Sequence, residues 1–223
     1  MDRSTRRWQF RQIVAWLMIV ALAPLQTGCV NALATAAWLV KGNDVDADWN
    51  GLRNKRVAVV CRPLVELQYS TGTRSAQELA VQVGRLMSQR VRKISIVDPR
   101  EVAEWTDEND WDDFAEVGKA LKADMVVGID VEEFSLYQSQ TLYQGKARLS
   151  VTVYDVADGG KTVYNKSIPR VVYPPNRGVD TSLPEDDFRR RFVAHLADIV
   201  GRHFYSHDGQ ADVALDAQGF HDE

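Results

Sequence analysis

One short apolar run constrains the fold of this chain more than any other feature. Residues 56–62 read RVAVVCR, and Pro63 ends the run. An unbroken series of valine and alanine, without alternating polar residues, is typical of a strand that is buried on both faces. Such a strand needs helices to cover its sheet. We therefore expect an α/β (α+β) fold, with helices packed on a single small mixed sheet.

The segments after this run alternate between helical and extended patterns. They predict the order β-α-β-α-β-β-β-α and a sheet of about five strands. After the first strand, the expected elements are a helix over 75–92, a strand over 93–98, a helical turn over 101–105, a helix over 112–122, strands over 124–136, 143–156 and 161–168, and a helix that opens at 183–186.

Two of these strands have a more detailed signature. In 143–156, the apolar residues Ala147, Leu149, Val151 and Val153 alternate with Arg148, Ser150 and Thr152. This alternation predicts one buried face and one polar face. The sequence Asp158-Gly159-Gly160 predicts a hairpin turn into the next strand, because glycine adopts positive φ without steric cost.

The first 28 residues indicate a secretory signal peptide. Four arginines precede an apolar run from Ile13 to Leu25. That run has about 13 residues, whereas a membrane-spanning helix needs roughly 20. Small residues follow it and end in Gly28-Cys29, as expected for a cleavage site. The alternative is an uncleaved signal anchor with an incidental cysteine.

Gly28-Cys29 resembles the lipobox of bacterial lipoproteins, although Gln26 occupies the place where that family prefers leucine. The resemblance implies cleavage before Cys29 and acylation of its sulfur. The domain organisation expected is a signal peptide over 1–28, a lipidated N-terminus and tether over 29–54, an α/β domain over 55–206 and a disordered tail over 207–223. Val30 follows the cysteine, where some bacteria place aspartate as an inner-membrane retention signal. The resemblance therefore favours the outer membrane, with the domain facing the periplasm.

A second resemblance covers residues 56–204. The segments RVAVVCRP, ISIVDPREV, VGKALKADMVVGIDVEEF and ARLSVTVYDVADGGKTVYNKS occur in this order. Together they resemble the envelope-lipoprotein superfamily that includes the curli secretion protein CsgG, the penicillin-binding-protein activator LpoB and the N-terminal domain of TolB. Membership would imply a non-enzymatic role: docking to an envelope protein or assembly into a homo-oligomer. Residues 130–156 include the charged residues Glu132, Glu133, Lys146 and Arg148, which would be costly to expose to lipid, so no pore is expected.

Charge excludes one class of partner. The whole chain has a net charge of −4, and removal of residues 1–28 makes it more negative, because that segment has four arginines and one aspartate. An acidic chain without a cationic cluster is not expected to bind nucleic acid. It also lacks an electrostatic attraction to anionic lipid, so membrane attachment would depend on the N-terminal lipid anchor.

The candidate contact residues are two tryptophans. Trp105 and Trp111 flank an acidic loop over 106–113. They are candidates for contact with a protein partner, since tryptophan is enriched at binding hot spots. The alternative is that both pack over the sheet.

Metal and catalytic sites are weakly indicated. His203 and His207 are spaced i, i+4, which can place two ligands on one helix face, but no third ligand accompanies them. The spacing of the acids in the loop does not match a calcium-binding EF-hand. Cys61 ends an apolar run, and we interpret it as a small buried hydrophobe rather than a nucleophile. We expect no metal, no cofactor and no catalytic residues. The alternative is a periplasmic metal-binding or small-ligand-binding protein, or an enzyme, that uses the acidic loop or the two histidines.

Overall fold

The computed structural model describes residues 44–63 and 71–209. The chain divides into two units, Met1–Asp44 and Val45–Glu223, and apart from Asp44 the described residues belong to the second unit. The predicted signal peptide, Cys29 and residues 30–43 of the predicted tether lie outside the described residues. The same holds for residues 210–223 of the predicted tail.

The described helices and strands follow the predicted order, with additional short elements. The strands are β1 (Asp44–Val45), β2 (Arg56–Pro63), β3 (Ser95–Ile96), β4 (Met125–Ser139), β5 (Leu142–Asp155), β6 (Lys161–Tyr173), β7 (Val179–Asp180) and β8 (His207–Asp208). The helices are α3 (Thr71–Arg90), α4 (Pro99–Glu108), α5 (Phe114–Ala120) and α6 (Glu185–Arg202).

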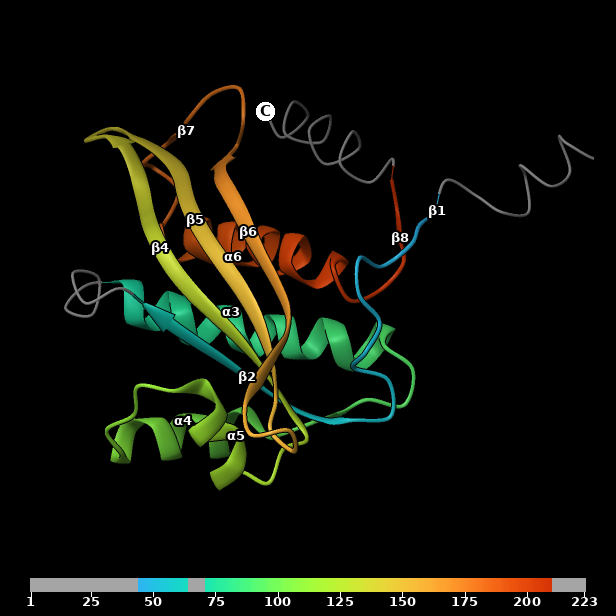
Figure 1. Ribbon diagram of the computed structural model, residues 1–223. Helices are drawn as coiled ribbons and strands as arrows, with labels where there is room; N and C mark the ends of the chain where they lie inside the picture. Colours follow the sequence, from blue (N-terminus) through green and yellow to red (C-terminus); the bar gives the residue numbers. More distant parts are fainter. Residues whose placement is uncertain (1–43, 64–70, 210–223) are drawn as a thin grey trace, which may run out of the picture. The chain divides into compact units, whose positions relative to one another are not determined.

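A mixed sheet forms the centre of the second unit (Figure 1). Its strand order is β3-β2-β4-β5-β6, and β7 pairs with β5. Strand β2 runs parallel to β3 and β4, whereas β5 runs antiparallel to β4, β6 and β7. The predicted mixed sheet with packed helices is confirmed. The glycine hairpin is confirmed too, because Gly159 and Gly160 both have positive φ, at 69° and 82°.

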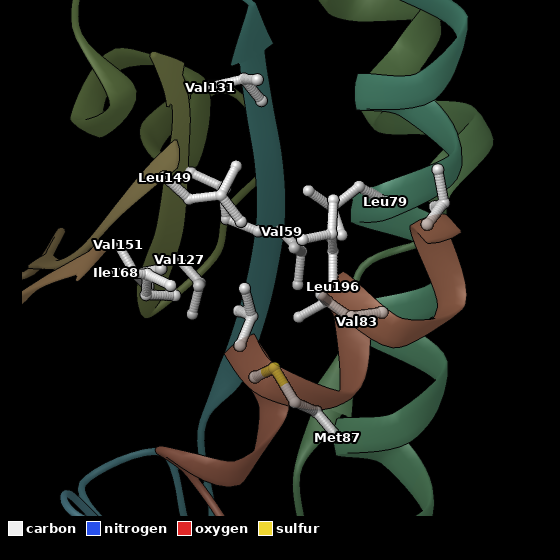
Figure 2. Close-up of a cluster of buried hydrophobic side chains, with 14 of the residues drawn as sticks. Val59, Leu79, Val83, Met87, Val127, Val131, Leu149, Val151, Ile168 and Leu196 are labelled. Carbon is white, nitrogen blue, oxygen red and sulfur yellow. The ribbon is translucent and has the colours of Figure 1, made fainter. Parts of the chain in front are cut away.

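Helices α3 and α6 cover one face of this sheet. Leu79, Val83 and Met87 recur at helical spacing on α3, and Phe188, Phe192 and Leu196 do so on α6; all six are buried. They pack against alternate residues of β2, β4 and β5, which include Val59, Val127 and Leu149 (Figure 2). This is the larger of the two cores, and its helices lie where the sequence predicts helices.

The opposite face has a smaller core beneath α4 and α5. There Ala58 and Val60 of β2 pack with Val102, Phe114, Val117 and Val126. Val57 and Val59 point to the larger core and Ala58 and Val60 to the smaller one. The continuous apolar run of β2 thus serves two cores at once, as predicted for a strand buried on both faces.

Aspartates begin both helices of the smaller core. The Asp98 side chain accepts a hydrogen bond from the Arg100 amide at 2.9 Å, and Asp113 accepts one from the Ala115 amide at 2.9 Å. Such N-caps satisfy amides that lack a partner within the helix. The helical turn predicted at 101–105 is a full helix, α4, because Asp98 and Pro99 provide a cap and a favourable first residue.

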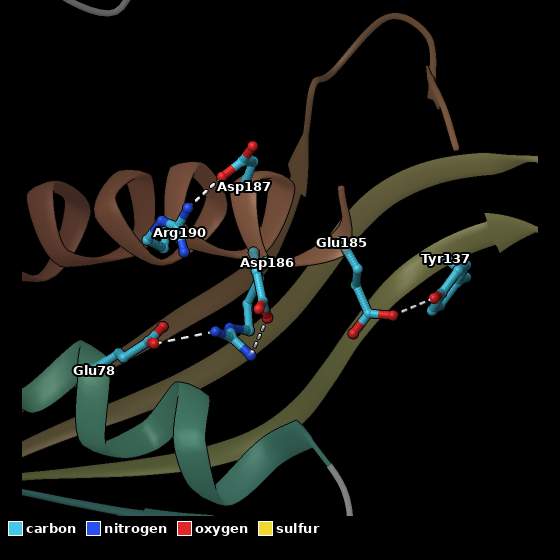
Figure 3. A network of polar contacts seen from close by, with 7 residues as sticks. Glu78, Tyr137, Glu185, Asp186, Asp187 and Arg190 are labelled. Atoms are coloured by element: carbon cyan, nitrogen blue, oxygen red, sulfur yellow. Dashed lines mark hydrogen bonds and ion pairs between the residues drawn. The ribbon is translucent and has the colours of Figure 1, made fainter. Parts of the chain in front are cut away.

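Helix α6 contains three consecutive arginines, Arg189, Arg190 and Arg191. A run of like charges is usually solvent-exposed, but one of these three is buried. Arg189 is 3% exposed, and its guanidinium lies 3.2 Å from Glu78 and 3.0 Å from Asp186. Figure 3 shows Glu78 of α3 and Asp186 of α6 pointing toward the space between the two helices. This pair of acids joins α3 to α6 through a buried charge, whereas Arg190 and Arg191 are exposed.

The folded unit begins earlier than the predicted boundary at Asn54. Leu52 is 1% exposed in the larger core. The Trp49 ring stacks on Tyr164 with centroids 5.7 Å apart, and its amide donates to the His203 carbonyl at 3.0 Å. Residues 49–52 are therefore part of the domain rather than of a tether. At the other end, His207 and Asp208 of the predicted tail form β8.

Gly128 determines how closely α5 approaches the sheet. A Cβ atom on Gly128 would lie 2.8 Å from Cγ of Phe114, which is 2% exposed. We predict that G128A lowers the free energy of unfolding by about 1–3 kcal/mol, as overpacking does. The matched control is G84A in α3, where a Cβ would meet its nearest atom at 3.4 Å. That change should raise stability by about 0.5–1 kcal/mol, as expected inside a helix. Urea unfolding measures both, and equal effects would contradict this packing.

Candidate interaction surface

Both predicted contact residues lie in the α4–α5 region. Trp105 and Trp111 are half-buried and pack against the smaller core. The Trp111 ring lies 5.4 Å from the Phe114 ring, measured between centroids. Both tryptophans therefore pack on the sheet, as in the alternative interpretation. Part of each side chain is exposed, so contact with a partner stays a prediction.

Arg62 connects the tryptophan region to the sheet. Its Nε donates to Asp130 at 2.8 Å, and one terminal nitrogen donates to the Asp112 carbonyl at 2.8 Å. The guanidinium also lies 4.6 Å from the Phe114 ring centroid and 5.7 Å from that of Trp111. Arg62 therefore joins β2, β4 and the loop before α5 at the border of the smaller core.

Beyond this border, the sheet face that bears α4 and α5 is exposed. Figure 1 shows α4 and α5 near the end of the sheet where β5 and β6 connect, and the other ends of β4, β5 and β6 extend away from them. The side chains there alternate with residues of the larger core, so they point to the opposite face. We call this region the open sheet face and define it by Glu133, Lys146, Arg148, Ser150, Ser167 and Arg170.

Glu133 is the electrostatic centre of the open sheet face. Arg170 on β6 donates to its Oε2 at 3.0 and 2.9 Å, and Arg148 on β5 lies 3.8 Å from the same oxygen. The Arg148 side chain is 46% exposed and the Arg170 side chain is 54% exposed. Exposed ion pairs of this kind add little to stability, about 1 kcal/mol or less. Their charges remain accessible to a partner.

The two histidines do not share a helix face. Helix α6 ends at Arg202, so His203 follows the helix and His207 belongs to β8. His203 Nδ1 lies 2.7 Å from Asp48 Oδ2, and Lys166 Nζ donates to the same oxygen at 3.1 Å. Within residues 44–63 and 71–209, no three His, Cys, Asp or Glu residues are grouped as metal ligands. The i, i+4 spacing was misleading because the helix ends too early.

The other two candidates have structural uses. Asp113 caps α5, and the Asp112 carbonyl accepts from Arg62, so the acidic loop is tied to the fold at its last residues. Burial raises the pKa of the Cys61 thiol far above its ordinary value, and the nearby Asp130 adds to the shift. A thiol in this state does not supply the thiolate that a cysteine nucleophile requires.

The open sheet face was only partly visible in the sequence. The alternation over 143–156 indicated that Arg148 and Ser150 lie on a polar face. No sequence pattern placed Glu133 and Arg170 on this face. The strand pairing shifts register after Val131 and after Ala147, so simple alternation does not predict which face these two side chains occupy. The proximity of Glu133, Arg148 and Arg170, which come from three different strands, becomes apparent only in the folded sheet.

Comparison with known proteins shows a distant likeness to solved structures. No protein-family profile matches the chain, and a search of curated proteins found no match. The PelC dodecamer from Paraburkholderia phytofirmans is similar with a TM-score of 0.42 and 11% identity over 73% of this chain and 95% of that one. Lipoprotein GNA1162 from Neisseria meningitidis has a TM-score of 0.41 and 10% identity over 65% and 96%. The LpoB C-terminal domain from Salmonella enterica has a TM-score of 0.36 and 10% identity over 60% and 90%.

The solved structures that this chain resembles thus include bacterial lipoproteins. Among the helices that the structure describes, none combines the length and the hydrophobicity needed to span a membrane.

The Asp48 contacts generate a pH-dependent prediction. Hydrogen bonds with His203 and Lys166 lower the pKa of Asp48. The ionised carboxylate therefore stabilises the fold above the unfolded-chain pKa of about 3.9, and this contribution disappears as the pH falls through the lower folded-state pKa. At pH 7 we expect D48N to lose about 1 kcal/mol or less, because the pair is exposed.

The measurement is urea unfolding of wild type and D48N between pH 7 and pH 2. Their stabilities should converge below about pH 4, where the aspartate becomes protonated. D110N, at an exposed position in the acidic loop, is the control with the same change in charge. A difference between wild type and D48N that is constant with pH would show that the carboxylate charge has no role.

Proposed function

We propose that this chain is an exported protein, acylated at Cys29, whose domain is a non-enzymatic interaction module of the cell envelope. The open sheet face is the observation on which the module assignment rests. It presents exposed charges from β4, β5 and β6 on one rigid surface. Arginine and tryptophan, which occupy and border this surface, are enriched at sites that bind proteins.

Trp111 and Arg62 form the border of the proposed binding surface. Arg62 fixes Trp111 beside the open sheet face through the contacts described above. A partner on that face would meet the exposed edge of Trp111 without any rearrangement of the domain. Tryptophan and arginine are the residue types enriched at binding hot spots, so this border is where the largest single-residue effects on binding are expected.

The membrane location rests on the sequence. The basic segment, the short apolar run and Gly28-Cys29 together support export and acylation. An acidic domain has no electrostatic attraction of its own to anionic lipid, so acyl chains would provide the attachment. The residue after Cys29 is valine, which supports placement at the outer membrane with the domain in the periplasm.

The anchor is tested by changing Cys29. We predict that wild type incorporates a palmitate analogue, loses the mass of residues 1–28 and remains in the membrane fraction after high-salt washing. C29A should be unlabelled and leave that fraction. C61A is the matched control, since it removes the other cysteine of the chain and should still be labelled. Labelling of C29A, or wild type at its uncleaved mass, would overturn the anchor.

The module is tested by photo-crosslinking in intact cells. A photoreactive amino acid replaces Ser167 on the open sheet face in the full-length chain, and Ser88 on α3 as the control; both positions are exposed. We predict a discrete crosslinked product from position 167 and none from position 88. Adding W111A should reduce the yield at 167 at least about tenfold if Trp111 is a hot spot worth 1.4 kcal/mol or more. The same products from both positions, or none from 167, would contradict a binding role for this face.

A further inference from the structure

The acidic residues of the domain are concentrated on the layer formed by α4, α5 and the loop between them. Between Pro99 and Lys122 the chain has eight acidic and three basic residues. All eight acidic side chains are exposed, and the apolar side chains of the same segment face the sheet. We call this surface, with Glu104 and Asp107 on its outer side, the acidic layer.

The open sheet face has the opposite charge. Its six defining residues include three cations, Lys146, Arg148 and Arg170, and one carboxylate, Glu133. Asp130 nearby is already matched by Arg62 at 2.8 Å. An acidic chain therefore has a basic patch next to its most acidic segment, on the same side of the sheet.

The two surfaces also match in shape. The acidic layer covers β2 and the adjoining part of β4, whereas the open sheet face lies farther along β4, β5 and β6. A helix with its side chains is about 10 Å across, so the edge of the layer forms a step of that height above the open sheet face. A layer of the same thickness would fill the step.

We propose that the open sheet face binds the acidic layer of a second copy of this chain. A twofold axis would place each layer on the open face of the other copy, and the two layers would lie side by side between two sheets. Such an interface is isologous and closes as a dimer. The proposal deepens the proposed function by naming the partner of the open sheet face.

Charge complementarity favours this occupant. Both surfaces belong to every copy, so each dimer contains the basic-to-acidic contact twice. Opposite charges across an interface orient the two partners, and like charges at the same positions disfavour binding. The Arg148 and Arg170 side chains are exposed and both pair with the single carboxylate of Glu133, so they can donate hydrogen bonds to further acidic groups.

A charge exchange tests the dimer in the full-length chain. Two tagged copies are co-expressed, membranes are solubilised, and the second tag is measured after capture of the first. We expect R148E/R170E to reduce recovery of a second R148E/R170E copy at least about tenfold, and E104K/D107K to do the same, because like charges meet at both contacts. Co-expression of R148E/R170E with E104K/D107K should restore recovery to about the wild-type level, since both contacts then pair opposite charges.

The matched control is R92E/R191E, which changes charge equally at exposed positions after α3 and on α6, the helices of the opposite sheet face. It should leave recovery unchanged. Restoration in the mixed pair also shows that both variants fold. Three results would overturn the proposal: no recovery between wild-type copies, recovery by each variant with itself at the wild-type level, or no restoration in the mixed pair. A different protein crosslinked to position 167 would leave the proposed function standing and overturn only the second copy as partner.

Discussion

Burial of β2 on both faces holds the domain together. Val57 and Val59 belong to the core beneath α3 and α6, and Ala58 and Val60 belong to the core beneath α4 and α5. Each of the three buried valines contributes about 1.5–3 kcal/mol. A polar residue at any of these positions would remove apolar contacts between the strand and the helices on that face. The packing of both helix layers therefore depends on one strand, β2.

The same strand explains why one part of the sheet is open. Parallel strands need crossover connections, and here the connections of β2 with β3 and β4 contain α3, α4 and α5, which cover both faces. Strands β4, β5 and β6 are joined by hairpins, which bring no helix with them. Helix α6 returns to only one face. The opposite face of the hairpins can thus stay exposed and polar, which is usual for antiparallel strands.

Local patterns were sufficient to predict most of the fold. The unbroken run at 56–62, the helical spacing of Leu79 and Val83, and the glycine hairpin each depend on neighbours in sequence. The burial of Arg189 could not be predicted in this way, because its partner Glu78 is 111 residues away and no local pattern reports such a pair. Trp49 and Leu52 were assigned to the tether for the same reason, since their contacts are with Tyr164, His203 and the core. The open sheet face depends on where α4 and α5 end relative to three strands, which is a property of the packed molecule.

The proposed anchor and the proposed dimer reinforce each other physically. Nineteen residues lie between Cys29 and Trp49, the first described residue that packs on the core, and a chain of that length spans at most about 70 Å. Copies attached to one membrane surface would thus meet within a thin layer, which raises their effective concentration without any new contact. The pairing of exposed charges weakens as salt screens them. Attachment would offset that weakness, so dimerisation should respond to loss of the anchor as well as to loss of Arg148 and Arg170. The Cys29 variant therefore changes the effective concentration of the two copies, whereas the charge-exchange variants change the contact between them.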